Sequence, residues 1–176
     1  MGSAGGAGPG GFRTFMIPDK QALLRQLIEQ LAERLSGFDK SAREAHAEAT
    51  HEQNKAENKY DTRAIEASYL AEGQARQAAE VASAIQALEG VTLRDFGPAT
   101  PIAPGALVQL EGNGEVAWYF MASCAGGAEL VSEGVSVLVL TPQSPLGGAL
   151  SGLKTGGKCR LQLGRERVAY TVKSVH

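Results

Sequence analysis

A polar segment at residues 51–60, HEQNKAENKY, is the part of the chain whose side chains are best suited to do chemistry. With the residue that follows, it supplies carboxylate and amide oxygens in close succession: Glu52, Asn54, Glu57, Asn58 and Asp61. Hard oxygen ligands of this kind suit Mg²⁺, which binds through a few carboxylates and keeps several of its waters. A few carboxylates in one segment do not by themselves make a strong site. The segment therefore indicates either a Mg²⁺ held mainly by another molecule or an ordinary solvated turn.

The sequence on either side of this segment predicts two helices. Residues 19–89 contain no proline, and apolar residues recur there in alternating steps of four and three, which keeps one stripe on one helix face. The first stripe consists of Leu24, Ile28, Leu31, Leu35, Phe38, Ala42, Ala45 and Ala49, and the second of Ala67, Ala71, Ala75, Ala78, Ala82, Ile85 and Leu88. We expect an antiparallel coiled-coil hairpin on the order of 45 Å long, with its tip near residues 51–60.

Composition changes near Gly90, where prolines and glycines become frequent. Together with the glycine-rich start of the chain, MGSAGGAGPGG, this change predicts four parts. They are a flexible tail at residues 1–18, the hairpin at 19–89, a proline-rich linker at 90–105 and a β domain at 106–176.

Short strands with turn signals between them fill the last part. Gly112-Asn113-Gly114 predicts a hairpin turn, because Asn and Gly accept positive φ angles. Ser144 and Pro145 predict the cap and first residue of a short helix that Gly152 ends. The expected strands span 106–111, 116–122, 135–141, 158–163 and 168–175. The fold class is α+β: a helical hairpin followed by a small antiparallel β domain with one short helix.

Composition excludes several classes of protein. The chain has 176 residues, 43% hydrophobic and 20% charged, with a formal net charge of -2, so a role in coating long stretches of nucleic acid is not indicated. Its apolar runs are too short to span a membrane. Cys124 and Cys159 lack the spacing of a metal site, and we expect a reduced, cytoplasmic setting.

The segment VLVLTPQSPLGGALSGLKTGGKCRLQLGRERVAYTVKSV carries a longer pattern, SPLxxALxGxKxGD. Its matching positions are Ser144, Pro145, Leu146, Ala149, Leu150, Gly152, Lys154 and Gly156, while Gly157 replaces the final Asp. This segment resembles the carboxy-terminal domain of the bacterial Gre transcript-cleavage factors (GreA and GreB). The order of hairpin and sheet extends the resemblance to most of the chain.

The resemblance implies an FKBP-like carboxy-terminal domain that docks at the rim of the secondary channel of RNA polymerase. The coiled coil of such factors enters the channel, and acidic tip residues help the active-site Mg²⁺ of the polymerase activate water for hydrolysis of backtracked RNA. It therefore implies a monomer that is not itself an enzyme. The protein would need no cofactor of its own, would bind bacterial RNA polymerase and would reach the nascent RNA 3′ end indirectly.

At the tip, the family pattern is D-x-x-E-N and this sequence has NKAEN. Glu57 and Asn58 match, but Asn54 stands where the metal-binding Asp is expected. Asp61 lies four residues after Glu57 and would share its face on a helix. We therefore expect Glu57 and Asp61 to be the residues near the shared Mg²⁺. The expected partner contacts are Asn54, Asn58, Ser144, Pro145 and Leu146.

Two other functions stay open at this point. A factor with a neutral residue at Asn54 would suit a non-cleaving regulator that occupies the channel and competes with true cleavage factors. Alternatively, the hairpin serves as a dimerisation module. A basic set in the β domain, consisting of Lys154, Lys158, Arg160, Arg165 and Arg167, predicts either a solvated face or electrostatic steering toward the polymerase rim or RNA.

Overall fold

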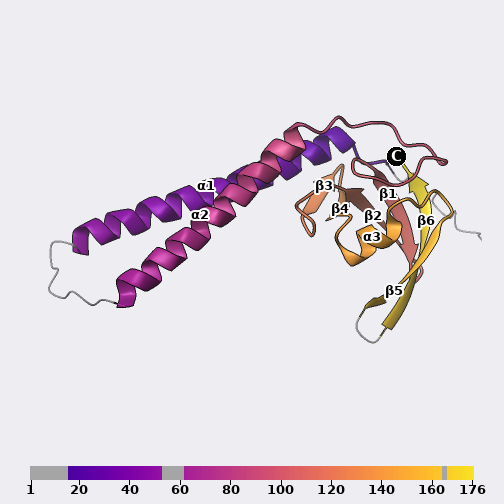
Figure 1. The fold of residues 1–176 in the computed structure, drawn as a ribbon. Helices are drawn as coiled ribbons and strands as arrows, with labels where there is room; N and C mark the ends of the chain where they lie inside the picture. Colours follow the sequence, from indigo (N-terminus) through magenta and orange to yellow (C-terminus); the bar gives the residue numbers. More distant parts are fainter. Residues whose placement is uncertain (1–15, 53–61, 164–165) are drawn as a thin grey trace, which may run out of the picture.

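The structure, a computed structural model, describes residues 16–52, 62–163 and 166–176. Two long helices are followed by a six-stranded sheet and one short helix (Figure 1), so the expected α+β fold is confirmed. The elements are α1 (Lys20–Glu52), α2 (Thr62–Glu89), β1 (Leu107–Gly112), β2 (Glu115–Met121), β3 (Glu129–Ser132), β4 (Val135–Leu140), α3 (Pro145–Leu150), β5 (Lys158–Leu163) and β6 (Glu166–Val175).

The two long helices lie side by side near the sheet and extend well beyond it (Figure 1). Helix α1 has 33 residues and α2 has 28. Helix α1 begins where the sequence indicates, because the Asp19 side chain accepts a hydrogen bond from the Gln21 backbone N–H at 2.9 Å. Pro18, just before it, is buried.

The strand order in the sheet is β3-β4-β2-β1-β6-β5. Four of its pairings are antiparallel, but β2 and β4 run parallel. The expectation of a fully antiparallel sheet is therefore wrong for this pair. The physical reason is β3, a short edge strand absent from the predicted elements, which turns back through Glu133 and Gly134 at positive φ angles of 53 and 77. Because β3 reverses the chain once more, β4 returns to β2 in the same direction.

The turn between β1 and β2 confirms the sequence prediction. Asn113 and Gly114 have φ angles of 53 and 81, and the pair Gly112 and Glu115 closes the hairpin. Both central residues have positive φ, which matches the right-handed twist of the flanking strands.

Both faces of the central strands are covered, and their side chains alternate between two cores. One core joins Trp118, Phe120, Val137 and Val139 to the base of the helical hairpin; we call this side the hairpin face. The other core lies beneath α3 and residues 96–106 and contains Val108, Leu110, Met121, Leu140, Leu150 and Val172. The segment 90–106 has no helix or strand, yet Phe96 and Ile102 within it are 6% and 2% exposed.

The helix stripes differ in part from the expected ones. Leu23 and Leu27, outside the first predicted stripe, are fully buried in the core that contains the hairpin-face residues. On α2, Val81 is 7% exposed, whereas its neighbour Ala82 in the predicted stripe is only partly buried. Because the base of the hairpin packs on the sheet as well as on itself, α1 needs two adjacent apolar stripes. No helix among residues 16–52, 62–163 and 166–176 is long and apolar enough to cross a membrane.

Candidate functional site

The predicted tip lies between the far ends of the two helices. Helix α1 ends at Glu52 and α2 begins at Thr62, and Figure 1 shows both ends on the side of the hairpin that points away from the sheet. The predicted tip residues Asn54, Glu57, Asn58 and Asp61 lie outside the described residues. Within the described part of the chain, no group of three or more His, Cys, Asp or Glu side chains could hold a metal ion.

Three hydrogen bonds fix the hairpin base to the sheet edge. The Gln26 side-chain oxygen accepts from the Val131 backbone N–H at 2.8 Å, and the Gln30 amide donates to the Glu129 carbonyl oxygen at 3.0 Å. The Asp19 N–H donates to the hydroxyl of buried Ser132 at 3.2 Å. Edge strands leave backbone groups unpaired, and side chains of α1 satisfy two of those on β3. The direction of the hairpin is thereby set by the sheet.

Apolar packing also stabilises the contact between the hairpin base and the sheet. Leu23 and Leu27 are 0% exposed and Leu88 is 1% exposed, all within the core that includes Trp118. Burying a leucine side chain stabilises a fold by about 1.5–3 kcal/mol. The hairpin is therefore held at its base as a firm extension of the sheet domain.

The outer half of the hairpin is far more exposed. Tyr69 and Leu70 on α2 are 72% and 65% exposed, and Ala42, Ala45 and Ala71 are also exposed. Two exposed apolar side chains of this kind are ordinary on a protein surface and do not by themselves mark a contact site. The sequence already indicated this exposure, since Tyr69 and Leu70 lie outside the apolar stripe predicted for the second helix.

The Ser144 hydroxyl closes the first turn of α3. Its Oγ accepts from the Gly147 N–H at 3.1 Å and donates to the Thr141 carbonyl oxygen at 2.7 Å. Pro145 occupies the first helical turn, where its missing N–H costs nothing. The predicted helix start is confirmed.

Glycine is required inside this motif. A Cβ built on Gly147 would lie 2.0 Å from the Thr141 carbonyl oxygen, so the helix start can pack this tightly on the preceding strand only without a side chain there. Gly152, which follows the helix, has a φ angle of 81 and ends it as expected.

The three predicted contact residues of this motif have unequal access to a partner. Pro145 is exposed, whereas Leu146 is partly buried against the core beneath α3, and the Ser144 hydroxyl is engaged in the cap. Pro145 therefore presents the motif to solvent. A partner contact by all three stays a prediction.

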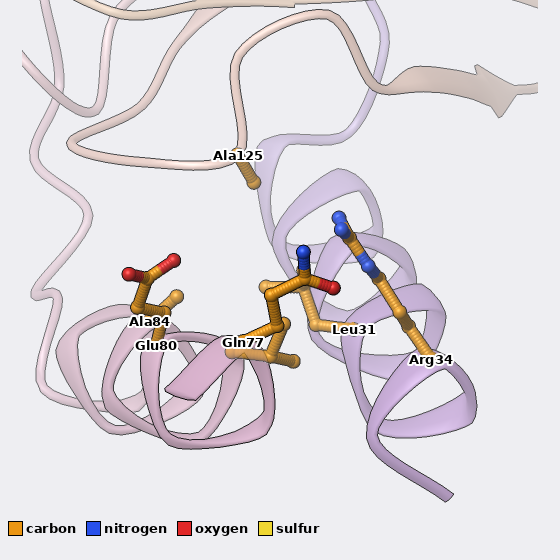
Figure 2. A pocket seen from close by; sticks show the side chains of 7 residues that line it. Leu31, Arg34, Gln77, Glu80, Ala84 and Ala125 are labelled. Carbon is orange, nitrogen blue, oxygen red and sulfur yellow. The ribbon is translucent and has the colours of Figure 1, made fainter. Parts of the chain in front are cut away.

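A hollow of about 270 Å³ lies where the two helices meet the loop after β2. It is lined by Leu31, Arg34, Gln77, Glu80, Val81, Ala84 and Ala125. Figure 2 shows Ala125 above the space between the helices, with Arg34 on one side and Glu80 on the other. These groups include no nucleophile paired with a base, so the hollow does not support a catalytic site.

Lys20, Asp95 and His176 form a polar cluster at the hairpin base. The His176 ring is 5.8 Å from the Trp118 ring, and burial, followed by the charge of Lys20, lowers the pKa of His176. Burial also lowers the pKa of Lys20, which the charge of Asp95 partly offsets. Lys20 lies over the Phe96 ring at 5.2 Å. These contacts tie α1 to the segment after α2, and sequence reasoning missed them because they join residues distant in the chain.

No protein-family model matches the chain, and the comparison with curated proteins gave no match. Among solved structures, the chain is similar to Gfh1 of Thermus aquaticus, with 22% identity and a TM-score of 0.38 over 84% of this chain and 92% of the other. GreA factor homolog 1 (Gfh1) of Thermus thermophilus gives 21% identity and a TM-score of 0.36, covering 85% and 94%.

A prokaryotic transcription elongation factor GreA/GreB from Nitrosomonas europaea matches at 16% identity and a TM-score of 0.34, covering 54% of this chain and 77% of its own. GreA is named in the second and the last of these structures.

The predicted basic set is divided by the structure. Lys158, Arg160 and Arg167 are exposed on the two neighbouring strands β5 and β6. Lys154 is exposed in the turn before β5, and Arg165 lies outside the described residues.

Proposed function

We propose that this chain is a Gre-type elongation factor that binds bacterial RNA polymerase at its secondary channel and modulates elongation. The observation that supports this most is the long hairpin fixed at one end to the sheet. With 33 residues, α1 is roughly 50 Å long at ~1.5 Å per residue. A hairpin of this length can bring its tip to a deep site if its base is held rigidly on the sheet.

The α3 motif supports the same proposal. The residues shared with the Gre pattern include the cap at Ser144 and the turn glycine Gly152, so the pattern corresponds to a defined local structure in this chain. Pro145 is exposed at the start of that helix and is the proposed point of contact with the rim of the channel.

In this proposal, the chemistry belongs to the polymerase. The carboxylates of Glu57 and Asp61 would help to hold the active-site Mg²⁺ of the polymerase, and that ion would supply the activation of water. Asn54 and Asn58 contribute neutral amides that contact the channel or the RNA end. The chain itself binds and positions, and it is not an independent enzyme.

The direct test is a cleavage assay on purified elongation complexes stalled with backtracked RNA. Addition of the protein is expected to release a short 3′ fragment, and Glu57→Ala and Asp61→Asn are expected to slow that release at least tenfold. Glu72→Ala, an exposed change elsewhere on α2, is the matched control and should leave it unchanged. Failure to bind polymerase would overturn the proposal, and a concentration-dependent mass without such binding would support the dimerisation module instead.

A second candidate is a non-cleaving factor that occupies the channel and competes with true cleavage factors. The specific observation in its favour is Asn54, because a neutral amide cannot supply the charge that holds a second Mg²⁺. Asn54→Asp separates the two candidates. If the wild-type chain binds polymerase without cleavage and Asn54→Asp cleaves, the non-cleaving function is supported.

A further inference from the structure

The outer two strands of the sheet carry basic side chains on one face. Strand pairing places Lys158 opposite Thr171, Arg160 opposite Ala169 and Gln162 opposite Arg167. Residues opposite each other in an antiparallel pair point to the same face. Exposure follows this alternation, because Lys158 and Arg160 are exposed while Cys159 between them is partly covered.

This basic face lies on the same side of the sheet as the helical hairpin but outside its footprint. Tyr170, which is paired with Gly112, packs against the core beneath α3. Its neighbour Thr171, which is paired with Glu111, therefore lies on the opposite face, the hairpin face. No residue of β5 or β6 belongs to the core beneath the hairpin. Figure 1 shows these strands at the far edge of the sheet from α1 and α2.

No ion pair among the described side chains compensates the charge on this face. None of the β5 and β6 positions on it is Asp or Glu, and within the described part of the chain Lys158, Arg160 and Arg167 form no ion pair. Glu111, which is paired with Thr171, binds Lys173 at 2.8 Å. Three free cations therefore remain in a chain whose net charge is -2.

The chemistry of the face favours phosphates over a protein partner. Protein interfaces are organised around buried aromatic or aliphatic anchors. The positions between the cations are Gln162, Ala169 and Thr171, and the aromatic Tyr170 lies on the opposite face. Cations two residues apart along a strand are roughly 6.6 Å apart, and neighbouring strands are about 4.8 Å apart. An array of cations at these spacings suits a repeating phosphate backbone, contacted without regard to base.

We propose that the basic face, defined by Lys158, Arg160 and Arg167, binds the phosphate backbone of single-stranded RNA. This activity goes beyond the polymerase binding proposed above and does not depend on it. Nonspecific contacts of this kind are weak, with dissociation constants of about 10⁻⁴–10⁻⁶ M at physiological salt. With three phosphates neutralised at ~0.7 counterions each, log Kd is expected to rise by roughly 2 per tenfold increase in salt.

The test is fluorescence anisotropy of a labelled oligouridylate with the full chain and no polymerase, over a series of salt concentrations. The triple variant Lys158→Glu, Arg160→Glu, Arg167→Glu is expected to weaken binding at least tenfold and to abolish most of the salt dependence. The control variant Lys40→Glu, Arg43→Glu, Arg76→Glu makes the same change in net charge on the hairpin and should retain binding. Its three sites are exposed.

Single variants Arg160→Ala and Arg167→Ala keep the test decisive if the triple variant fails to fold, and each is expected to weaken binding two- to five-fold. The proposal is overturned if the wild-type chain does not bind the RNA at low salt, or if the hairpin control loses binding equally. It is also overturned if polyglutamate binds the wild-type chain more tightly than the RNA does, since the face would then suit an acidic protein.

Discussion

The side chain of Gln26 on α1 completes the edge of the sheet at Val131, whose backbone N–H donates to the Gln26 side-chain oxygen at 2.8 Å. One turn further along, Gln30 donates to the carbonyl oxygen of Glu129. A helix thus takes the place of a neighbouring strand on β3. The orientation of the hairpin depends on these contacts as well as on its apolar base.

Removing this contact should loosen the hairpin base. Gln26→Ala leaves the Val131 N–H without its protein partner, and we expect a loss of about 0.5–1.5 kcal/mol in the free energy of unfolding. Urea denaturation followed by circular dichroism measures it. Glu29→Ala, at a neighbouring exposed position on α1, is the control and should change stability by less than about 0.5 kcal/mol. Equal losses in both variants would contradict a role for the hydrogen bond.

Leu27 should be among the most sensitive apolar positions of the hairpin. Its side chain is fully buried between the helices and the hairpin face, so Leu27→Ala should cost about 2–5 kcal/mol. Trp118, the single tryptophan, lies in the same core and reports the separation of hairpin and sheet through its fluorescence. Leu70→Ala, at a 65% exposed site, should leave both stability and fluorescence nearly unchanged.

Two glycine substitutions should have opposite effects. Gly147→Ala places a Cβ 2.0 Å from the Thr141 carbonyl oxygen and should destabilise the fold by about 3 kcal/mol or more. Gly73→Ala lies on α2 with no atom within 4 Å of the added Cβ, and should stabilise by about 0.5–1 kcal/mol. Thermal unfolding of the two variants compares them directly. A stable Gly147→Ala protein would show that α3 can shift away from β4.

Stability should fall in mildly acidic solution because of His176. Folding lowers the pKa of this imidazole below its ordinary 6.5, through burial and then the charge of Lys20, so the unfolded chain binds the proton more readily. The contribution of His176 to the free energy of unfolding is present above about pH 6.5 and is lost as the pH falls through the folded-state pKa. His176→Gln should flatten the dependence of unfolding free energy on pH between about 7 and 5.

A second variant checks the cause of that shift. Lys20→Met removes the neighbouring charge, so the pKa of His176 should rise toward its ordinary value and the pH dependence should weaken. Titration of the His176 ring by NMR measures the pKa directly. An unchanged pKa in Lys20→Met would assign the whole shift to burial.

Local signals in the sequence were sufficient for several elements. The turn at Asn113 and Gly114, the cap at Ser144 and the end of α3 at Gly152 all depend on the conformational preferences of a few adjacent residues. The strand β3 gave no comparable signal, because only Leu130 and Ser132 of its four residues are buried and its neighbours supply the pairing. The parallel pairing of β2 and β4 was missed for the same reason.

The sequence by itself determined the long helices, five of the six strands and the residue types at the tip, since periodicity and turn preferences act over a few residues. Tertiary structure decided which side chains are buried and which elements contact one another. The burial of Leu23 and Leu27, the contact of Gln26 with Val131 and the face shared by Arg160 and Arg167 all join segments through packing or strand register. Such relationships depend on where elements meet in space, and no local pattern in the chain encodes that meeting.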